Sequence, residues 1–262
     1  MKYNSAVCVV LLSFGCATTQ VAAPPDPVAL SDEEKRQDPI PAATKLLEQR
    51  ETPRNLDRAV ALLQWHLDQH PDSVRLHELL AEAHARSCEA LDLNKSEDQA
   101  PHKEHRTEGL RHGEQAVKLD PRSGAAHYWY AANLLHAADA ERSLSRAKEA
   151  LRRLDQADEL APKVDAGGPS RMRGKVLQDM PGLFGGSTSK AIASYRRSLE
   201  MAPDCITTHL WLGQAYLDAK KPDLARKEFE WVAAAKTRAG HEKEDAADKQ
   251  KAQELIKKLE AK

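Results

Sequence analysis

The sequence predicts an all-α fold built from about five stacked helix pairs and a C-terminal capping helix. The chain has 41 alanines but only 4 isoleucines and 11 valines. Strands favour β-branched and aromatic residues, whereas Ala, Leu, Glu, Lys and Arg favour helices. Similar stretches end at Pro71, Pro121, Pro162 and Pro203. Because proline cannot continue a helix, these four residues mark the ends of repeating helical units.

The N-terminal segment has the pattern of an export signal. Lys2 precedes an apolar run at residues 6–15, which is too short for a bilayer core that needs about 20 helical residues. The Gly15-Cys16 junction resembles the lipobox of bacterial lipoproteins, although Ser13 stands where that motif usually has leucine. The resemblance implies a signal peptide at residues 1–15, a lipid on Cys16 and the periplasmic face of the outer membrane. A secreted periplasmic form is the alternative.

The segment after Cys16 is predicted to be a disordered tether. Residues 16–41 contain five prolines and no apolar periodicity. The helical repeat domain is therefore expected at residues 42–239, and a charged capping helix at residues 240–262. The net charge of −1 provides no general attraction for phosphates, so nucleic-acid binding is not expected.

The clearest repeat begins at Ile206. Leu212-Gly213 and Tyr216 are followed by Ala225 and Phe229, which lie nine and thirteen residues after the tyrosine. This spacing resembles the tetratricopeptide repeat, in which small residues allow two helices to pack closely. Extending the pattern through the chain gives helix pairs at 41–71, 72–121, 122–162, 167–203 and 204–239, with insertions at about 87–101 and 180–186.

The middle of the chain carries a further ordered series of motifs: His127-Tyr128-Trp129 with Asn133, Gly167-Gly168-Pro169 with Arg171, and Gly185-Gly186-Ser187 with Lys190. This series resembles the T-component family of TRAP transporters, and the similarity covers about residues 122–235. The resemblance implies a non-catalytic lipoprotein that docks a periplasmic solute-binding protein and holds a hydrophobic ligand.

A concave groove is the expected binding site, because the first helices of such pairs line the inner face of the array. Arg171 is expected to reach this groove and bind a carboxylate or a partner. The wall is expected to be apolar in its middle and C-terminal parts, which favours a hydrophobic ligand or a peptide helix. These residues are alternatively ordinary surface positions. The complete set of groove candidates is Glu78, Glu82, Tyr128, Ala132, Asn133, Arg171, Leu210, Gln214 and Leu217.

No cofactor or metal site is predicted. Residues 185–190 lack the spacing of a phosphate-binding loop, and Ser187 is expected to cap the following helix. His102, His105 and His112 share one helix face, but no cysteine or carboxylate motif completes a metal site.

The remaining histidines and cysteines are assigned structural positions. Three histidines at equivalent repeat positions are expected to pack between helices: His77, His127 and His209. Cys88 and Cys205 fall in distant repeats and are predicted to be free thiols.

The sequence therefore favours a binding module rather than an enzyme. An outer-membrane assembly scaffold of the pilotin type is the main alternative to the transporter role. A hydrolase in the inserted loops is a third hypothesis, which the lack of a Ser-His or Cys-His arrangement disfavours.

Overall fold

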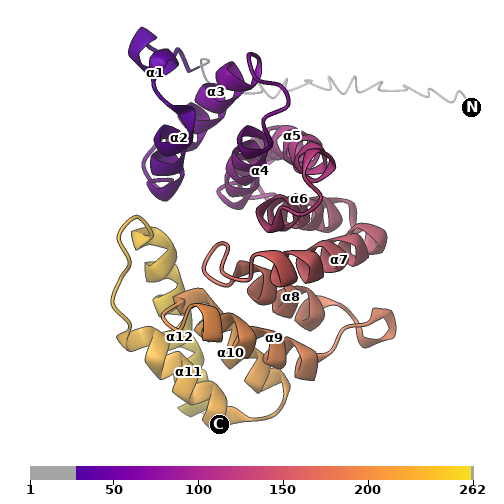
Figure 1. Cartoon of the computed structure of the whole chain (residues 1–262). Coiled ribbons are helices and arrows are strands. Elements are labelled where there is room, and N and C mark those ends of the chain that lie inside the picture. The colour runs from indigo at the N-terminus through magenta and orange to yellow at the C-terminus, as the bar shows by residue number, and fades with distance from the viewer. Residues whose placement is uncertain (1–27, 261–262) are drawn as a thin grey trace, which may run out of the picture.

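The computed structural model describes residues 28–260, and these form α-helices, one 3₁₀ turn and connecting loops (Figure 1). The predicted all-α fold is confirmed. The signal peptide and the lipidation site at Cys16 lie outside the described residues. No helix within residues 28–260 combines the length and apolarity needed to cross a membrane.

Within residues 28–260, five helix pairs follow one another along a curved array (Figure 1). The pairs agree with the predicted units, and each proline that ends a unit lies just after a helix. The pairs are α2 (Pro39–Glu48) with α3 (Asn55–Leu67), α4 (Val74–Glu89) with α5 (Ser96–Leu119), α6 (Gly124–Glu141) with α7 (Leu144–Leu160), α8 (Gly168–Asp179) with α9 (Thr188–Met201), and α10 (Ile206–Asp218) with α11 (Pro222–Ala234).

Serine side chains begin several of these helices. Ser73, Ser123 and Ser187 each accept a hydrogen bond from the backbone N–H three residues later, which satisfies a donor that the first helical turn leaves free. The predicted cap at Ser187 is therefore confirmed. The insertion at 180–186 contains a short 3₁₀ turn, η1 (Gly182–Phe184).

Two segments are more helical than the sequence predicted. Most of the expected insertion at 87–101 extends α4 and α5, so that only residues 90–95 form a loop. Pro101 lies inside α5, where it lacks an N–H donor and its ring crowds the carbonyl of the preceding turn. Within the expected tether, α1 (Asp32–Arg36) forms because Ser31 and Glu34 make a reciprocal capping box.

Close helix packing depends on small residues, as predicted. A Cβ atom on Gly213 would lie 2.4 Å from Cε1 of Phe229, so only glycine lets α10 approach α11 this closely. Ala225 and Phe229 are fully buried in the same cluster. Each pair therefore buries its apolar face against its own partner helix and against the next pair.

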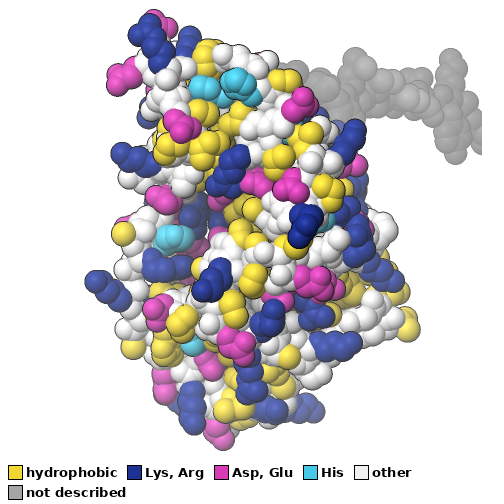
Figure 2. All heavy atoms as spheres, in the orientation of Figure 1, with side chains coloured by type: hydrophobic (Ala, Val, Ile, Leu, Met, Phe, Trp, Pro, Cys, Tyr) yellow, Lys and Arg dark blue, Asp and Glu magenta, His cyan; other side chains and the backbone are white. Residues whose placement is uncertain are grey.

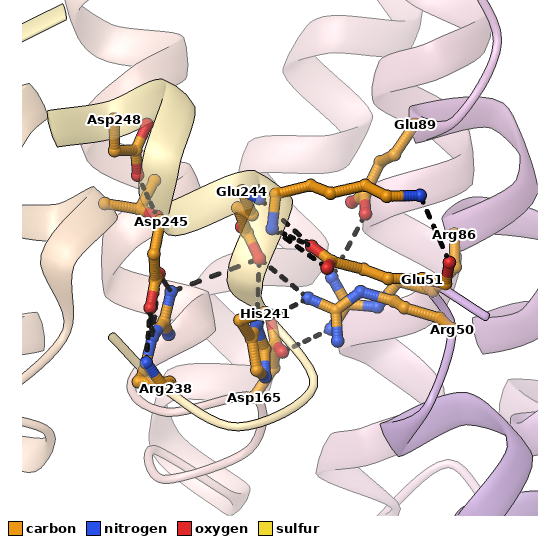
Figure 3. Close-up of polar contacts among 12 residues, drawn as sticks. Arg50, Glu51, Arg86, Glu89, Asp165, Arg238, His241, Glu244, Asp245 and Asp248 are labelled. Atoms are coloured by element: carbon orange, nitrogen blue, oxygen red, sulfur yellow. Dashed lines mark hydrogen bonds and ion pairs between the residues drawn. The ribbon is translucent and has the colours of Figure 1, made fainter. Parts of the chain in front are cut away.

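The last helix, α12 (Glu242–Glu260), caps the array and also connects its two ends. Leu255, Ile256 and Leu259 pack against the C-terminal core. The start of α12 meets the loop between α2 and α3, where the Glu51 carboxylate accepts the backbone N–H groups of Lys243 and Glu244 (Figure 3). The array therefore closes on itself around a central hollow.

Candidate ligand-binding cavity

The closed array encloses a polar cavity of about 440 Å³ between its N-terminal pairs and α12. A second hollow of about 770 Å³ adjoins it. Figure 2 shows a depression on this side of the molecule, with basic, acidic and histidine side chains gathered around it. The residues that line both spaces are Arg50, Arg86, Asp165, Arg171, Thr207 and Glu244.

Asp165 forms the centre of the cavity wall. It begins a turn of three residues with positive φ: 49° at Asp165, 52° at Ala166 and 73° at Gly167. Positive φ is unfavourable for residues that carry a Cβ atom, so surrounding contacts must hold this turn. The carboxylate of Asp165 accepts hydrogen bonds from Arg86, Arg171 and the hydroxyl of Tyr128.

Two arginines hold the charge of Asp165. Burial would raise the pKa of its carboxyl, but Arg86 and Arg171 outweigh that effect and hold the pKa below its ordinary value. Arg86 also pairs with Glu89, whereas Arg171 pairs with Asp165 at 2.6 Å. Asp165 thus lies between two guanidinium groups, and the formal charges of these four side chains balance.

Glu82 lies on the same wall, one helical turn before Arg86. Burial raises the pKa of Glu82 to about 7, despite the opposing effects of Arg86 and Arg75. Its charge is therefore partly suppressed near neutral pH. Partial protonation of Glu82 therefore reduces the negative charge of the cavity wall near neutral pH.

The opposite wall comes from the contact that closes the array. Arg50 donates to Glu244 at 2.8 Å, and the side chain of His241 hydrogen-bonds to the same carboxylate at 2.9 Å (Figure 3). The hydrogen bond from His241, together with Arg50 and Arg238, lowers the pKa of Glu244 to about 2. Glu244 is therefore ionised across the physiological range and binds the two ends of the chain together.

The structure brings only some of the predicted groove residues to the cavity. Arg171 and Glu82 line it, and Tyr128 lines the adjoining hollow although it is almost completely buried. Glu78 is buried beside the rim, where it pairs with Arg75 at 3.0 Å.

The other predicted groove residues lie in helix packing. Asn133 is buried and donates to the backbone oxygens of Ala81 and Trp129. Ala132 and Leu210 are also buried, and Leu217 packs against the C-terminal core. Gln214 is half-buried and lines neither cavity. The wall is therefore polar where the sequence predicted an apolar surface, because the apolar side chains are used between helices.

Several cavity residues were missed by sequence reasoning. Arg50, Asp165 and Arg238 lie in loops between helices, so helical periodicity gives no signal for them. Arg86 was detectable, since it follows the predicted Glu82 by four residues and shares its helix face.

The three equivalent histidines occupy structural positions. In each case Nε2 hydrogen-bonds to the backbone oxygen of the proline six residues earlier, at 3.0 Å for His77, 3.0 Å for His127 and 2.9 Å for His209. The rings thus connect each first helix to the end of the preceding unit. Cys88 and Cys205 are buried free thiols, as predicted.

Comparisons with known proteins agree on the type of fold. Residues 183–240 match the tetratricopeptide repeat, and residues 40–163 match the family described as regulator of microtubule dynamics protein 1-3. No curated protein matches the chain significantly.

Two solved structures share the architecture. The tetratricopeptide-repeat protein TTC0263 from Thermus thermophilus superposes with a TM-score of 0.57 at 18% identity, covering 86% of this chain and 98% of that one. PilF from Pseudomonas aeruginosa superposes with a TM-score of 0.55 at 16% identity, covering 84% of this chain and 91% of that one.

Proposed function

Because the chain folds as a tetratricopeptide-repeat array, we propose that it is a non-catalytic binding module whose central cavity takes a carboxylate-bearing segment of a protein partner. In this proposal the chain is a lipid-anchored, periplasm-facing accessory protein that docks a solute-binding protein, as in the T-component family. The Gly15-Cys16 junction and the motifs from His127 to Lys190 support that context.

One observation carries the choice of ligand. Arg86 and Arg171 converge on the single carboxylate of Asp165 at the cavity wall. Guanidinium groups present several N–H donors in a planar fork that matches a carboxylate. A second carboxylate, supplied by the partner, would pair with these guanidinium groups from the cavity side. The polar wall favours such a ligand over the hydrophobic one that the family resemblance implies.

Affinity capture from cross-linked native envelopes tests the role. The bound proteins and small molecules are identified by mass spectrometry. We expect a solute-binding protein to be enriched. Enrichment of an outer-membrane assembly component instead would favour the scaffold alternative, and a co-purifying apolar metabolite would contradict the carboxylate ligand.

Two arginines provide a matched pair of variants for this capture. Arg75 lines the cavity and Arg111 lies outside it, yet both side chains are about half exposed and both pair with a glutamate three positions away on their own helix. The Arg75→Glu variant should lose most of the captured partner, whereas Arg111→Glu should retain it. Equal loss of the captured partner in both variants would mean that the partner binds outside the cavity.

The anchor is tested separately. With a lipid on Cys16, the wild-type chain should fractionate with membranes and a Cys16→Ser variant should fractionate with soluble periplasmic protein. An unchanged distribution would contradict lipidation at this residue.

A further inference from the structure

A second cluster of reactive side chains lies away from the cavity, where α4, α5 and α6 pack against one another. Cys88 is in the last turn of α4, His102 is near the start of α5, and His136 is in α6. One ligand atom from each residue lies within 4.8 Å of the other two. Cys88 and His102 are buried, with 2% and 3% of their surfaces exposed.

The environment of His102 indicates that a bonding partner is missing. Its Nδ1 atom is buried and has no hydrogen-bond partner among residues 28–260. Unpaired buried polar atoms are destabilising and uncommon in folded proteins, so each one calls for a specific explanation. This atom belongs to the same ring that lies beside Cys88 and His136.

The third residue comes from α6. His136 is half-buried, and one of its ring nitrogens lies within 4.8 Å of the ligand atoms of the other two residues. The rings of His102 and His136 meet edge to face, with centroids 5.9 Å apart.

We propose that Cys88, His102 and His136 form a Zn²⁺ site with a solvent oxygen as the fourth ligand. One thiolate and two imidazoles are donors that Zn²⁺ prefers. In a tetrahedral zinc site such ligand atoms lie roughly 3.3–3.6 Å apart, so small side-chain rotations bring this cluster to bonding geometry. Binding forms one Zn–S bond and two Zn–N bonds, and the thiol proton passes to solvent.

The structure separates the histidines that share a helix face in the sequence. His112 pairs with His77 at 2.9 Å between Nδ1 atoms, and His105 pairs with His84 at 3.0 Å. Of the three histidines on that helix face, His102 is the one that remains for metal binding. Sequence reasoning placed no cysteine beside these histidines, whereas the structure places Cys88 within 4.8 Å of His102 in the same helix pair.

Spectroscopic titration of the full chain with Co²⁺, followed by displacement with Zn²⁺, tests the site. Thiolate coordination to Co²⁺ produces a ligand-to-metal charge-transfer band. We expect one ion per chain, a charge-transfer band that Zn²⁺ abolishes, and a rise in the melting temperature with Zn²⁺.

The two buried free cysteines supply the control. Cys88→Ser should lose the band and weaken Zn²⁺ binding by at least about tenfold, whereas Cys205→Ser should keep both. A His136→Gln variant should weaken binding while it retains the thiol. Melting curves recorded with a chelator establish that each variant is folded.

Two results would overturn the site. One is a wild-type chain without saturable binding of a single ion. The other is a Cys88→Ser variant that retains the charge-transfer band, which would assign thiolate coordination to one of the other cysteines.

Discussion

The carboxylate of Glu51 accepts the backbone N–H of Lys243 at 2.9 Å, although the two residues are 192 positions apart. A carboxylate is favourable at a helix N-terminus because it pairs with free N–H groups and with the positive end of the helix dipole. Glu51 therefore caps α12 from the far end of the chain. Together with the ion pair between Arg50 and Glu244, this contact turns an open array into a closed one.

Replacement of Glu51 by Ala should open the array at this point. Loss of a capping side chain typically costs about 1 kcal/mol, so the folded domain should persist. Hydrogen–deuterium exchange should become faster in the first turn of α12. Glu48→Ala, in the same part of the chain, is the control and should leave that exchange unchanged, since its side chain makes no contact with α12 that caps the helix.

Glu82 should make the domain less stable in mild alkali. Its pKa is about 7 in the folded protein and about 4.5 when exposed, so the folded state holds the extra proton between these values. The free energy of unfolding therefore decreases as the pH rises through 7, by at most about 3 kcal/mol. Glu82→Gln should be more stable than wild type at pH 8, with little difference at pH 5.

Thermal unfolding of Glu82→Gln and of the exposed control Glu104→Gln between pH 5 and pH 8 tests this effect of Glu82 on stability. A Glu82→Gln curve parallel to wild type would mean that Glu82 titrates normally.

The buried histidines should make the domain less stable in acid. Burial, with repulsion from neighbouring histidines and Arg111, lowers the pKa values of His84 and His112 to about 3. The unfolded chain takes up protons below pH 6.5 that the folded chain does not, so stability falls as the pH falls. Each histidine accounts for about 2 kcal/mol between pH 6.5 and pH 5.

The slope of stability against pH tests this effect independently of absolute stability. His112→Leu should flatten that slope below pH 6.5. His70→Leu alters an exposed ring and should leave it as in wild type. Equal slopes in all three proteins would be inconsistent with the buried imidazoles as the source.

Helix packing predicts that replacement by alanine should affect stability differently at two glycines. Gly213→Ala would place a methyl group 2.4 Å from Phe229, and overpacking of this kind typically costs about 1–3 kcal/mol. Gly182 has open space around its Cβ position, so Gly182→Ala should change stability by no more than about 0.5 kcal/mol. Denaturant unfolding of both variants checks the pair, and equal effects would count against close packing at Gly213.

The sequence predicted the architecture well because the repeat determines it locally. Prolines at unit ends and small residues such as Gly213 and Ala225 carry the same meaning in each copy. The closure of the array was not predictable, because Glu51 and Lys243 belong to no repeated position. The same reason explains why Asp165 and Arg238, both in loops, were missed.

The residues of the candidate groove were predicted less well, because a place on the inner face of the array does not determine whether a side chain is exposed. Helical register assigns Leu210 and Ala132 to the inner face, but a strongly curved, closed array buries such residues against the next pair. Long polar side chains such as Arg171 can still extend into the central space. Register alone cannot distinguish these two outcomes.

Site-specific photo-cross-linking in native envelopes tests the central claim most directly, that the cavity is the binding face. A photoreactive amino acid at Arg75 lies on the cavity rim, and one at Arg111 lies at an equally exposed position outside the cavity. The account predicts a cross-linked protein partner from position 75 and none from position 111. A partner that cross-links from position 111 alone would contradict it.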